Sequence, residues 1–319
     1  MKNSIELISK RPHGIGGSDI AAVLGLSPFK TALQLWAEKV GHPGAVEARG
    51  IHLRFGQRLE PFVASEYERV TGLYTSEVAS PIFHPEHGFM FASIDRLVTS
   101  SEDEQATANG RVVAQRILEC KTASVFSRGE WGTEGTEQVP TAYLLQCAWY
   151  MAISGCNQAD IAVLLGNNDF RVYTVKRDMH LEGLILDQAQ RFWYDHVLAC
   201  EPPPPQTAED ALLLFPKDEQ GLKVEADDET LELLKRYESA SDEASQISAE
   251  AEDLRAQLMA RMGHAQEITL GGMVLATWRC SKPTRRLDVH ALRSAHPDIA
   301  EQFTLTSPGS RRFVLRSQP

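Results

Sequence analysis

The sequence lacks the features that mark membrane-spanning and secreted proteins. It has no apolar run of about 18 residues or more, the length that a transmembrane helix needs. Its first residues, MKNSIELISKRPHG, contain no apolar signal core. The five cysteines are odd in number and form no CxxC pair, which disfavours a disulfide framework and a zinc site. We therefore expect a soluble protein with reduced thiols, located in a cytosol.

Positive charge is scarce overall, and the deficit is unevenly distributed. The formal net charge is −11, which by itself disfavours nucleic acid as a partner. Residues 201–264 hold 6 lysines and arginines against 16 acidic residues, whereas residues 265–319 hold 8 against 4. Because DNA affinity depends on local contacts with phosphates, a basic groove elsewhere on the surface remains compatible with this total.

The first 200 residues alternate predicted helices and strands, which indicates an α/β core with a central mixed sheet. Ser18 is predicted to cap a short helix, and Thr31 to begin a second helix that ends at Gly41. The other predicted helices are 57–71, 141–154 and 179–200. The predicted strands are VASPIF (78–83), GFMFASIDRLV (88–98), RVVAQRILECKT (111–122), ADIAVLLG (159–166) and FRVYTVK (170–176).

A proline-rich segment, EPPPPQ at 201–206, divides the chain. We expect a core at 1–200, a linker at 201–227 and an appendage of helix, short strands and basic tail at 228–319. Within the appendage, residues 228–262 have apolar or small side chains at a spacing of three and four. This stripe favours a helix packed on a domain or in a helical hairpin over a coiled-coil oligomer, because several of its positions are only alanine.

Three charged residues interrupt two apolar strands, SIDRLV and ILECKTA. Side chains alternate along a strand, so Glu119 and Lys121 share one face. An antiparallel pairing of the two strands would bring Asp95 next to Glu119, with Lys121 one pleat further on. By itself, Asp95 is equally compatible with an ordinary surface charge at the end of a strand. The tripeptide ECK is less compatible with that interpretation, because it lies inside an apolar strand.

Two neighbouring carboxylates repel each other unless a cation lies between them. Carboxylates and water are the hard oxygen ligands that Mg²⁺ prefers, and bound Mg²⁺ activates water and stabilises the charge of phosphoryl transfer. We therefore expect Asp95, Glu119 and Lys121 to form a magnesium-dependent nuclease site. An Asp followed by a hairpin and E-x-K is the pattern of the PD-(D/E)xK nucleases.

Further polar residues occur at positions compatible with that site. Glu60 lies on the helix before the strands, although by itself it fits a surface helix residue. Tyr143 and Gln146 are three residues apart, so they share a face of an otherwise apolar helix. Such a pair can line a polar cleft, although a hydrogen-bonded core tyrosine is more common.

Residues 8–200 resemble the YqaJ-type viral recombinases, whose relative is the lambda exonuclease. The motifs that carry the resemblance are GIGGSDIAAVLGLSPFKTALQLWAEKVG, FGQRLEP, SIDRLV, LECKTAS and YLLQCAWYMAISG, in the family's order and at similar spacing. The ending SRRFVLR resembles the tail of some YqaJ-type phage proteins. The lambda-type enzyme has no obvious counterpart of the segment beyond about residue 201.

The resemblance implies a phage or prophage protein in the cytosol of a bacterial host. It implies a magnesium-dependent 5′→3′ exonuclease that digests one strand of linear duplex DNA to mononucleotides and leaves a 3′ overhang for recombination by strand annealing. It also implies a ring-shaped homotrimer and a single-strand annealing protein as partner. Two other functions fit the same core, a structure-specific endonuclease and a non-catalytic scaffold that binds DNA ends.

The resemblance also implies individual roles. Asp95, Glu119 and the backbone carbonyl of Cys120 would bind two Mg²⁺ ions, with Mn²⁺ as a possible substitute. Lys121 would orient water or stabilise the phosphate, Glu60 would be an auxiliary carboxylate, and Gln146 and Tyr143 would line the site.

Two further implied sites concern the DNA end and the duplex. Arg11, Ser18 and Ser93 would bind a terminal 5′-phosphate, and Leu53 would be a wedge that parts the last base pairs. Candidate residues for contacting the duplex are Arg54, Arg58 and Arg128.

Overall fold

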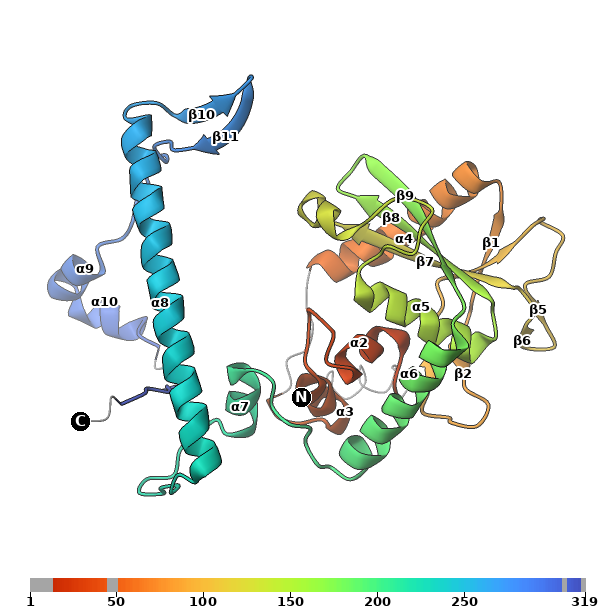
Figure 1. The fold of residues 1–319 in the computed structure, drawn as a ribbon, viewed down its shortest axis with the longest axis horizontal. Helices are drawn as coiled ribbons and strands as arrows, with labels where there is room; N and C mark the ends of the chain where they lie inside the picture. Colours follow the sequence, from red (N-terminus) through yellow and green to blue (C-terminus); the bar gives the residue numbers. More distant parts are fainter. Residues whose placement is uncertain (1–13, 45–50, 306–308, 317–319) are drawn as a thin grey trace. The chain divides into compact units, whose positions relative to one another are not determined.

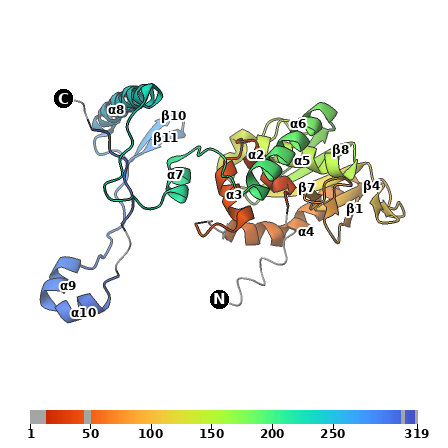
Figure 2. The ribbon, with the colours of Figure 1, turned by 90° about the horizontal axis from the view of Figure 1, so that it is seen from below.

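The computed structural model describes residues 14–44, 51–305 and 309–316, without the side chains of 51–53. The chain forms two compact units, Met1–Phe215 and Pro216–Pro319, and Figures 1 and 2 show the elements of each. No helix among the described residues is both long and apolar enough to cross a membrane.

A five-stranded mixed sheet organises the first unit, in the order β1-β4-β7-β8-β9 (Figure 1). Its strands are β1 (Tyr74–Glu77), β4 (Arg96–Thr99), β7 (Arg116–Ala123), β8 (Gln158–Leu165) and β9 (Asp169–Lys176). β7 pairs antiparallel with β4 and parallel with β8, while the outer pairs are antiparallel. The predicted mixed sheet, and the predicted pairing of the two strands that hold the charged residues, are therefore confirmed.

Helices cover both faces of this sheet. On one face, α4 (Ile51–Thr71) packs Val63, Ala64 and Tyr67 against β7 and β8. On the other face, α5 (Thr141–Ser154) lies within the main core, with Leu145, Trp149 and other apolar side chains buried. The described residues of this unit form further helices: η1 (Gly17–Asp19), α2 (Ile20–Val23), α3 (Ala32–Val40), η2 (Val125–Glu130), α6 (Met179–Arg191), the π-helical η3 (Phe192–Leu198) and α7 (Ala208–Leu214).

Local signals account for most helix ends, with one correction. Thr31 caps α3 by accepting the Gln34 N–H, and Gly41 ends that helix at a φ of 68°, as predicted. Ser18, however, lies inside η1 and caps nothing. Gly16 is the residue before the turn, and its N–H donates to the Asp19 carboxylate. The Asp19 carboxylate thus binds the N–H of the residue before the turn, which is the N3 half of a capping box.

The predicted long strands are shorter and more divided than expected. VASPIF overlaps only β2 (Ile82–Phe83), and GFMFASIDRLV separates into β3 (Phe91–Ala92) and β4. RVVAQRILECKT separates into β6 (Arg111–Val112) and β7, and β6 pairs with β5 (Thr107–Ala108), which lies before the predicted strand. The break before β4 frees Ser93, Ile94 and Asp95 from strand pairing, so Asp95 can turn toward β7.

The proline-rich segment is followed by a helix that packs on the first unit. Asp210 of α7 is fully buried and accepts a 2.8 Å hydrogen bond from the Thr31 hydroxyl. Leu213 and Leu214 pack against the main core. Residues 201–215 therefore belong to the first unit, although the sequence predicted a linker over 201–227.

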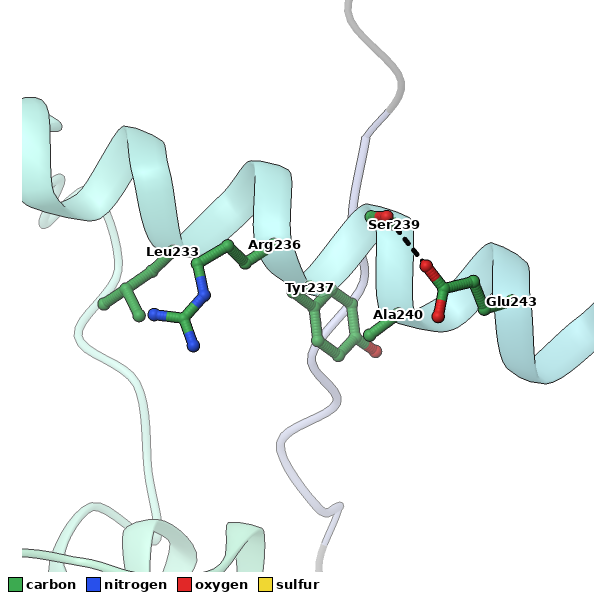
Figure 3. A pocket seen from close by; sticks show the side chains of 6 residues that line it. All are labelled: Leu233, Arg236, Tyr237, Ser239, Ala240 and Glu243. Atoms are coloured by element: carbon green, nitrogen blue, oxygen red, sulfur yellow. Dashed lines mark hydrogen bonds between the residues drawn. The ribbon is translucent and has the colours of Figure 1, made fainter.

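The second unit contains little buried surface. It consists of α8 (Asp228–Met262), a hairpin of β10 (Glu267–Leu270) and β11 (Met273–Thr277), α9 (Val289–Ala295) and α10 (Pro297–Gln302). The helix predicted at 228–262 is confirmed, but Met262 is its only buried residue. Tyr237 meets the Phe313 ring edge-on, beside an open hollow lined by Leu233, Arg236 and Ala240 (Figure 3). Within the second unit as described, α8 forms no helical hairpin. The predicted packing of its stripe on a domain stays a prediction.

Candidate active site

The three charged residues converge where β4 stops and β7 continues. The last registered pair is Arg96 with Leu118, so Asp95 lies one residue beyond the ladder, beside Glu119. Its Oδ2 accepts a 2.8 Å hydrogen bond from the backbone N–H of Cys120. The charges lie on and beside the central strand of the sheet, where β4 stops and leaves part of β7 without a partner on that side. We call this place the notch.

Glu119 is a buried carboxylate with one satisfied oxygen. Its side chain comes from β7 and the residue is 3% exposed. Oε1 lies 2.6 Å from Lys121 Nζ and accepts a 2.6 Å hydrogen bond from Gln146 Nε2. Oε2 is buried without any hydrogen-bond partner. A buried carboxylate oxygen without a partner is costly, so this atom is suited to binding a cation.

Lys121 is held by residues of α5. Its Nζ donates to Gln146 Oε1 at 3.1 Å and lies 4.8 Å from the centre of the Tyr143 ring. Tyr143 in turn stacks on buried Trp131, with ring centroids 5.6 Å apart. The prediction that Tyr143 and Gln146 share a helix face is therefore confirmed, and both side chains contact Lys121.

The surroundings of the notch disfavour the ionised form of both carboxyl groups at the same time. Burial, and then the charge of Glu119, raise the pKa of Asp95 to about 8. Burial also raises the pKa of Glu119, although Lys121 counteracts that shift. Burial disfavours the charged form of Lys121, but Glu119 and then Asp95 outweigh it and raise its pKa above the usual range. The pair of carboxylates therefore needs a positive charge beyond that of Lys121.

A hard divalent cation fits these residues. Asp95 and the unpartnered oxygen of Glu119 supply carboxylate ligands, and Mg²⁺ is commonly bound by one or two carboxylates with several waters. The N–H and C=O of a strand residue point to the same edge, so the Cys120 carbonyl faces β4 together with the N–H that binds Asp95. No group of three or more His, Cys, Asp or Glu residues suited to a metal ion occurs among the described residues. A second ion would therefore have to share these ligands with water and substrate.

Glu60 lies on α4 as predicted, but it is bound to an arginine that sequence reasoning did not single out. Arg96 Nη1 lies 2.7 Å from Glu60 Oε1 and 2.6 Å from the carbonyl oxygen of Asp95. Arg96 Nη2 also lies 3.3 Å from Glu77 on β1. Arg96 is only 8% exposed. It therefore connects α4, β4 and β1 directly beside Asp95.

Two other contributors were missed, Tyr150 and Gly17. The Tyr150 hydroxyl accepts a 2.9 Å hydrogen bond from Gln146 Nε2, one turn earlier on α5. A Cβ atom on Gly17 would clash with the Tyr150 ring and crowd Gln146. The i,i+4 spacing of Gln146 and Tyr150 was a usable signal. The close approach of Gly17 had no local signal, because it depends on a contact across the fold.

The residues assigned to the 5′-phosphate are only partly described. Arg11 lies outside the described residues. Ser18 and Ser93 are both exposed. The segments that precede them lie side by side, because Ile15 exchanges backbone hydrogen bonds with Phe89 (2.7 Å) and Phe91 (3.1 Å).

The candidate wedge and duplex contacts lie on α4 and η2. Leu53 is within α4, but its side chain is outside the described part. Arg54 and Arg58 are exposed on the same helix. Arg128 on η2 is half-exposed and forms a 2.6 Å ion pair with Asp169.

The fold and the notch together define the class of protein. A mixed sheet between α4 and α5 has an aspartate, immediately before β4, beside an E-x-K tripeptide on the neighbouring β7. The fold class is therefore the one predicted, an α/β core of the PD-(D/E)xK type.

Comparison with known proteins finds a domain family and a relative that are similar to this chain. Residues 8–157, slightly less than half of the chain, match the YqaJ-like viral recombinase domain. The chain is also 29% identical, over 319 residues, to the uncharacterized protein YqaJ of Bacillus subtilis (strain 168). That similarity covers 98% of this chain and 93% of the relative, so it includes both units.

Solved structures give more distant likenesses. An alkaline exonuclease (LHK-Exo) from Laribacter hongkongensis is 19% identical, with a TM-score of 0.45, over 61% of this chain and 93% of that one. A phage related exonuclease from Haemophilus somnus 129PT is 16% identical, with a TM-score of 0.42, over 58% and 95% of the two chains. Likenesses at this level do not establish a shared activity.

Proposed function

We propose that this protein is a magnesium-dependent 5′→3′ exonuclease that digests one strand of linear duplex DNA to mononucleotides. The remaining 3′ overhang would serve recombination by strand annealing. One observation carries the proposal: Asp95 and a Glu119 oxygen without a partner lie together beside Lys121. The match of residues 8–157 to a viral recombinase domain supports DNA as the substrate.

Each residue of the notch would have its own role in the reaction. Asp95, Glu119 and the Cys120 carbonyl would bind Mg²⁺, with Mn²⁺ as a substitute and two ions per site as the family pattern implies. Bound Mg²⁺ would supply an activated water and offset the charge that develops on the phosphate. Once Glu119 is engaged by the metal, Lys121 Nζ is available to orient the water or bind a phosphate oxygen. Gln146 and Tyr143 would hold Lys121, and Glu60 would act as an outer carboxylate.

The proposed preference for a DNA end depends on the loops around Ile15 and Phe91, which bring the candidate phosphate-binding serines together. The hydrogen bonds between them support a shared location for Ser18 and Ser93, which with Arg11 would bind the 5′-phosphate. Guanidinium and hydroxyl groups satisfy a phosphate dianion well. Leu53 would be the wedge at the last base pairs. A homotrimeric ring, a single-strand annealing protein as partner and a bacterial cytosol as location belong to the same proposal.

The deciding experiment compares linear duplex, with and without a 5′-phosphate, with closed circular duplex, in the presence and absence of Mg²⁺. We expect mononucleotides from the linear substrates only, with Mg²⁺ required and the 5′-phosphate favoured. Lys121→Ala should lower turnover by about 100- to 1,000-fold, because a charge that stabilises the transition state is lost, while DNA binding persists. Lys176→Ala, on an exposed lysine at the end of β9, is the matched control and should be active.

Two other outcomes would replace this proposal. Cutting of closed circular DNA would indicate a structure-specific endonuclease on the same core. Binding of DNA ends without any magnesium-dependent degradation would indicate a non-catalytic scaffold. The presence of Asp95, Glu119 and Lys121 together disfavours the scaffold, because clustered buried charges would give it no structural benefit.

A further inference from the structure

A phenylalanine beside the notch is almost completely exposed. Phe126 on η2 is 95% exposed, the highest value among the large apolar side chains that the structure describes. Single exposed apolar residues are common on protein surfaces and by themselves indicate nothing. Phe126 differs in how it is held and in where it lies.

The short helix that presents Phe126 is anchored at both ends. Ser124 caps it by accepting the Phe126 N–H at 3.2 Å. The Val125 side chain packs so closely on the turn between β8 and β9 that a Cβ on Gly166 would clash with it. At the other end, buried Trp131 donates its backbone N–H to the Arg128 carbonyl at 3.2 Å. The ring is therefore mounted on a fixed support and not on a loose loop.

η2 directly continues the strand that holds the catalytic residues. β7 ends at Ala123, two residues after Lys121, and η2 begins at Val125. At about 3.3 Å per strand residue, Lys121 lies roughly 7 Å from the end of β7. The N-terminal half of α4 reaches the same end, since a Cβ on Gly56 would lie 3.9 Å from the Thr122 hydroxyl oxygen. Phe55 on that helix is also more than half exposed.

Two arginine side chains accompany the exposed ring. Asp169 pairs with both Arg128 (2.6 Å) and Arg171 (2.7 Å), so two guanidinium groups share one carboxylate. Glu130 at the end of η2 balances the remaining charge, so Arg128 supplies a guanidinium group beside the ring without a net positive surface. Aromatic rings beside cations are the combination that binds nucleic acid strands, because every base offers a face for stacking and every nucleotide a phosphate.

We propose that Phe126 stacks on a nucleobase of the DNA that leaves or enters the notch, with Arg128 contacting a neighbouring phosphate. This inference rests on the proposed nuclease function and assigns a DNA contact beyond the notch. Because stacking tolerates any base, the contact would hold the strand without regard to sequence. The competing explanation is that a second copy of this chain packs on the exposed ring. The experiment distinguishes this explanation from contact with DNA.

The test measures binding in the Lys121→Ala background, so that the DNA is not digested. The probe is linear duplex with 2-aminopurine at successive positions from the 5′ end, titrated in the presence of Mg²⁺. Phe126→Ala should weaken binding about 5- to 100-fold and change the 2-aminopurine fluorescence at one or two adjacent positions. Phe126→Trp should bind as the parent does. Phe126→Leu, which is apolar but cannot stack, should resemble alanine. Arg128→Ala should reduce the slope of log affinity against log salt by about one.

Leu184→Ala is the control, because Leu184 is an exposed apolar residue on α6. It should leave binding and fluorescence unchanged. Sedimentation of each variant without DNA reports the oligomeric state, and a change caused only by the Phe126 variants would overturn the proposal in favour of a protein interface. Equal binding by Phe126→Ala and its parent would also overturn it. Failure of the parent to bind any duplex would instead count against the nuclease function itself.

Discussion

Asp95 and Glu119 are unfavourable to the fold while no metal is bound. Both carboxyl groups lie in a notch where burial raises their pKa, to about 8 for Asp95. The hydrogen bond from Cys120 and the ammonium of Lys121 compensate only in part. Such a pair at the centre of a sheet therefore makes physical sense only if a cation relieves the repulsion.

The first prediction concerns stability against pH in the metal-free protein. Because the pKa of Asp95 is raised on folding, its contribution to stability is fully present below about pH 4 and is lost as pH rises toward 8. The loss approaches about 1.4 kcal/mol per pH unit for one proton. Asp95→Asn cannot ionise and keeps an oxygen for the Cys120 N–H. Its free energy of unfolding should therefore increasingly exceed that of the parent between pH 4 and pH 8.

Denaturant unfolding with EDTA, at several pH values, measures this difference. Added Mg²⁺ should stabilise the parent most at high pH, because metal binding competes with the proton on Asp95, and should not stabilise Asp95→Asn. A constant difference between the two proteins across the whole pH range would contradict the assigned shift.

At the scale of elements, the site depends on how α4 is attached to the sheet. Arg96 binds Glu60 on α4 and Glu77 on β1 while its Nη1 also donates to the Asp95 carbonyl. The same side chain therefore sets the position of the auxiliary carboxylate and of the backbone at Asp95. A change at Arg96 should therefore affect both the carboxylates at the notch and the attachment of α4 to the sheet.

The second prediction compares how much each of the two ion pairs of Arg96 contributes to the free energy of unfolding. Arg96→Met should lower the free energy of unfolding by about 2 kcal/mol, because Glu60 is left half-buried without its partner. It should also weaken the stabilisation by Mg²⁺, since Asp95 loses support. Glu77→Gln is the control: its carboxylate is 80% exposed, and such pairs contribute about 0–1 kcal/mol. Equal losses from both substitutions in thermal or denaturant unfolding would refute this division.

At the scale of the whole molecule, nearly all buried residues belong to the first unit. Among the described residues of the second unit, Met262 is the one buried apolar side chain. The described part of the second unit therefore has no core of its own to stabilise it. The fold of the first unit should therefore be independent of residues after 215.

The third prediction tests that boundary with two truncations. A chain of residues 1–215 should unfold cooperatively at nearly the temperature of the full chain. A chain of residues 1–200 should be less stable by about 2 kcal/mol or more, because it loses the Asp210 contact with Thr31 and the packing of Leu213 and Leu214. Calorimetry of both chains provides the comparison. Equal stability would show that α7 contributes nothing to the core.

The alternation and spacing of apolar residues in the sequence were sufficient to predict the helices and strands of the sheet and part of the site. Periodicity predicted α5 at its observed bounds, and strand alternation put Glu119 and Lys121 on one face. Thr31 and Gly41 marked the ends of α3 because capping depends on adjacent residues. The family motifs selected Gln146 and Tyr143 for the same site.

Only the tertiary structure decided which side chains meet across elements. Arg96 was visible beside Asp95, yet its partners Glu60 and Glu77 lie on other elements and could not be read from spacing. The contact of Gly17 with Tyr150, the attachment of α7 beyond the prolines and the full exposure of Phe126 have the same origin. Local sequence determines periodicity and capping within a few residues, whereas these features depend on packing between segments that are distant along the chain.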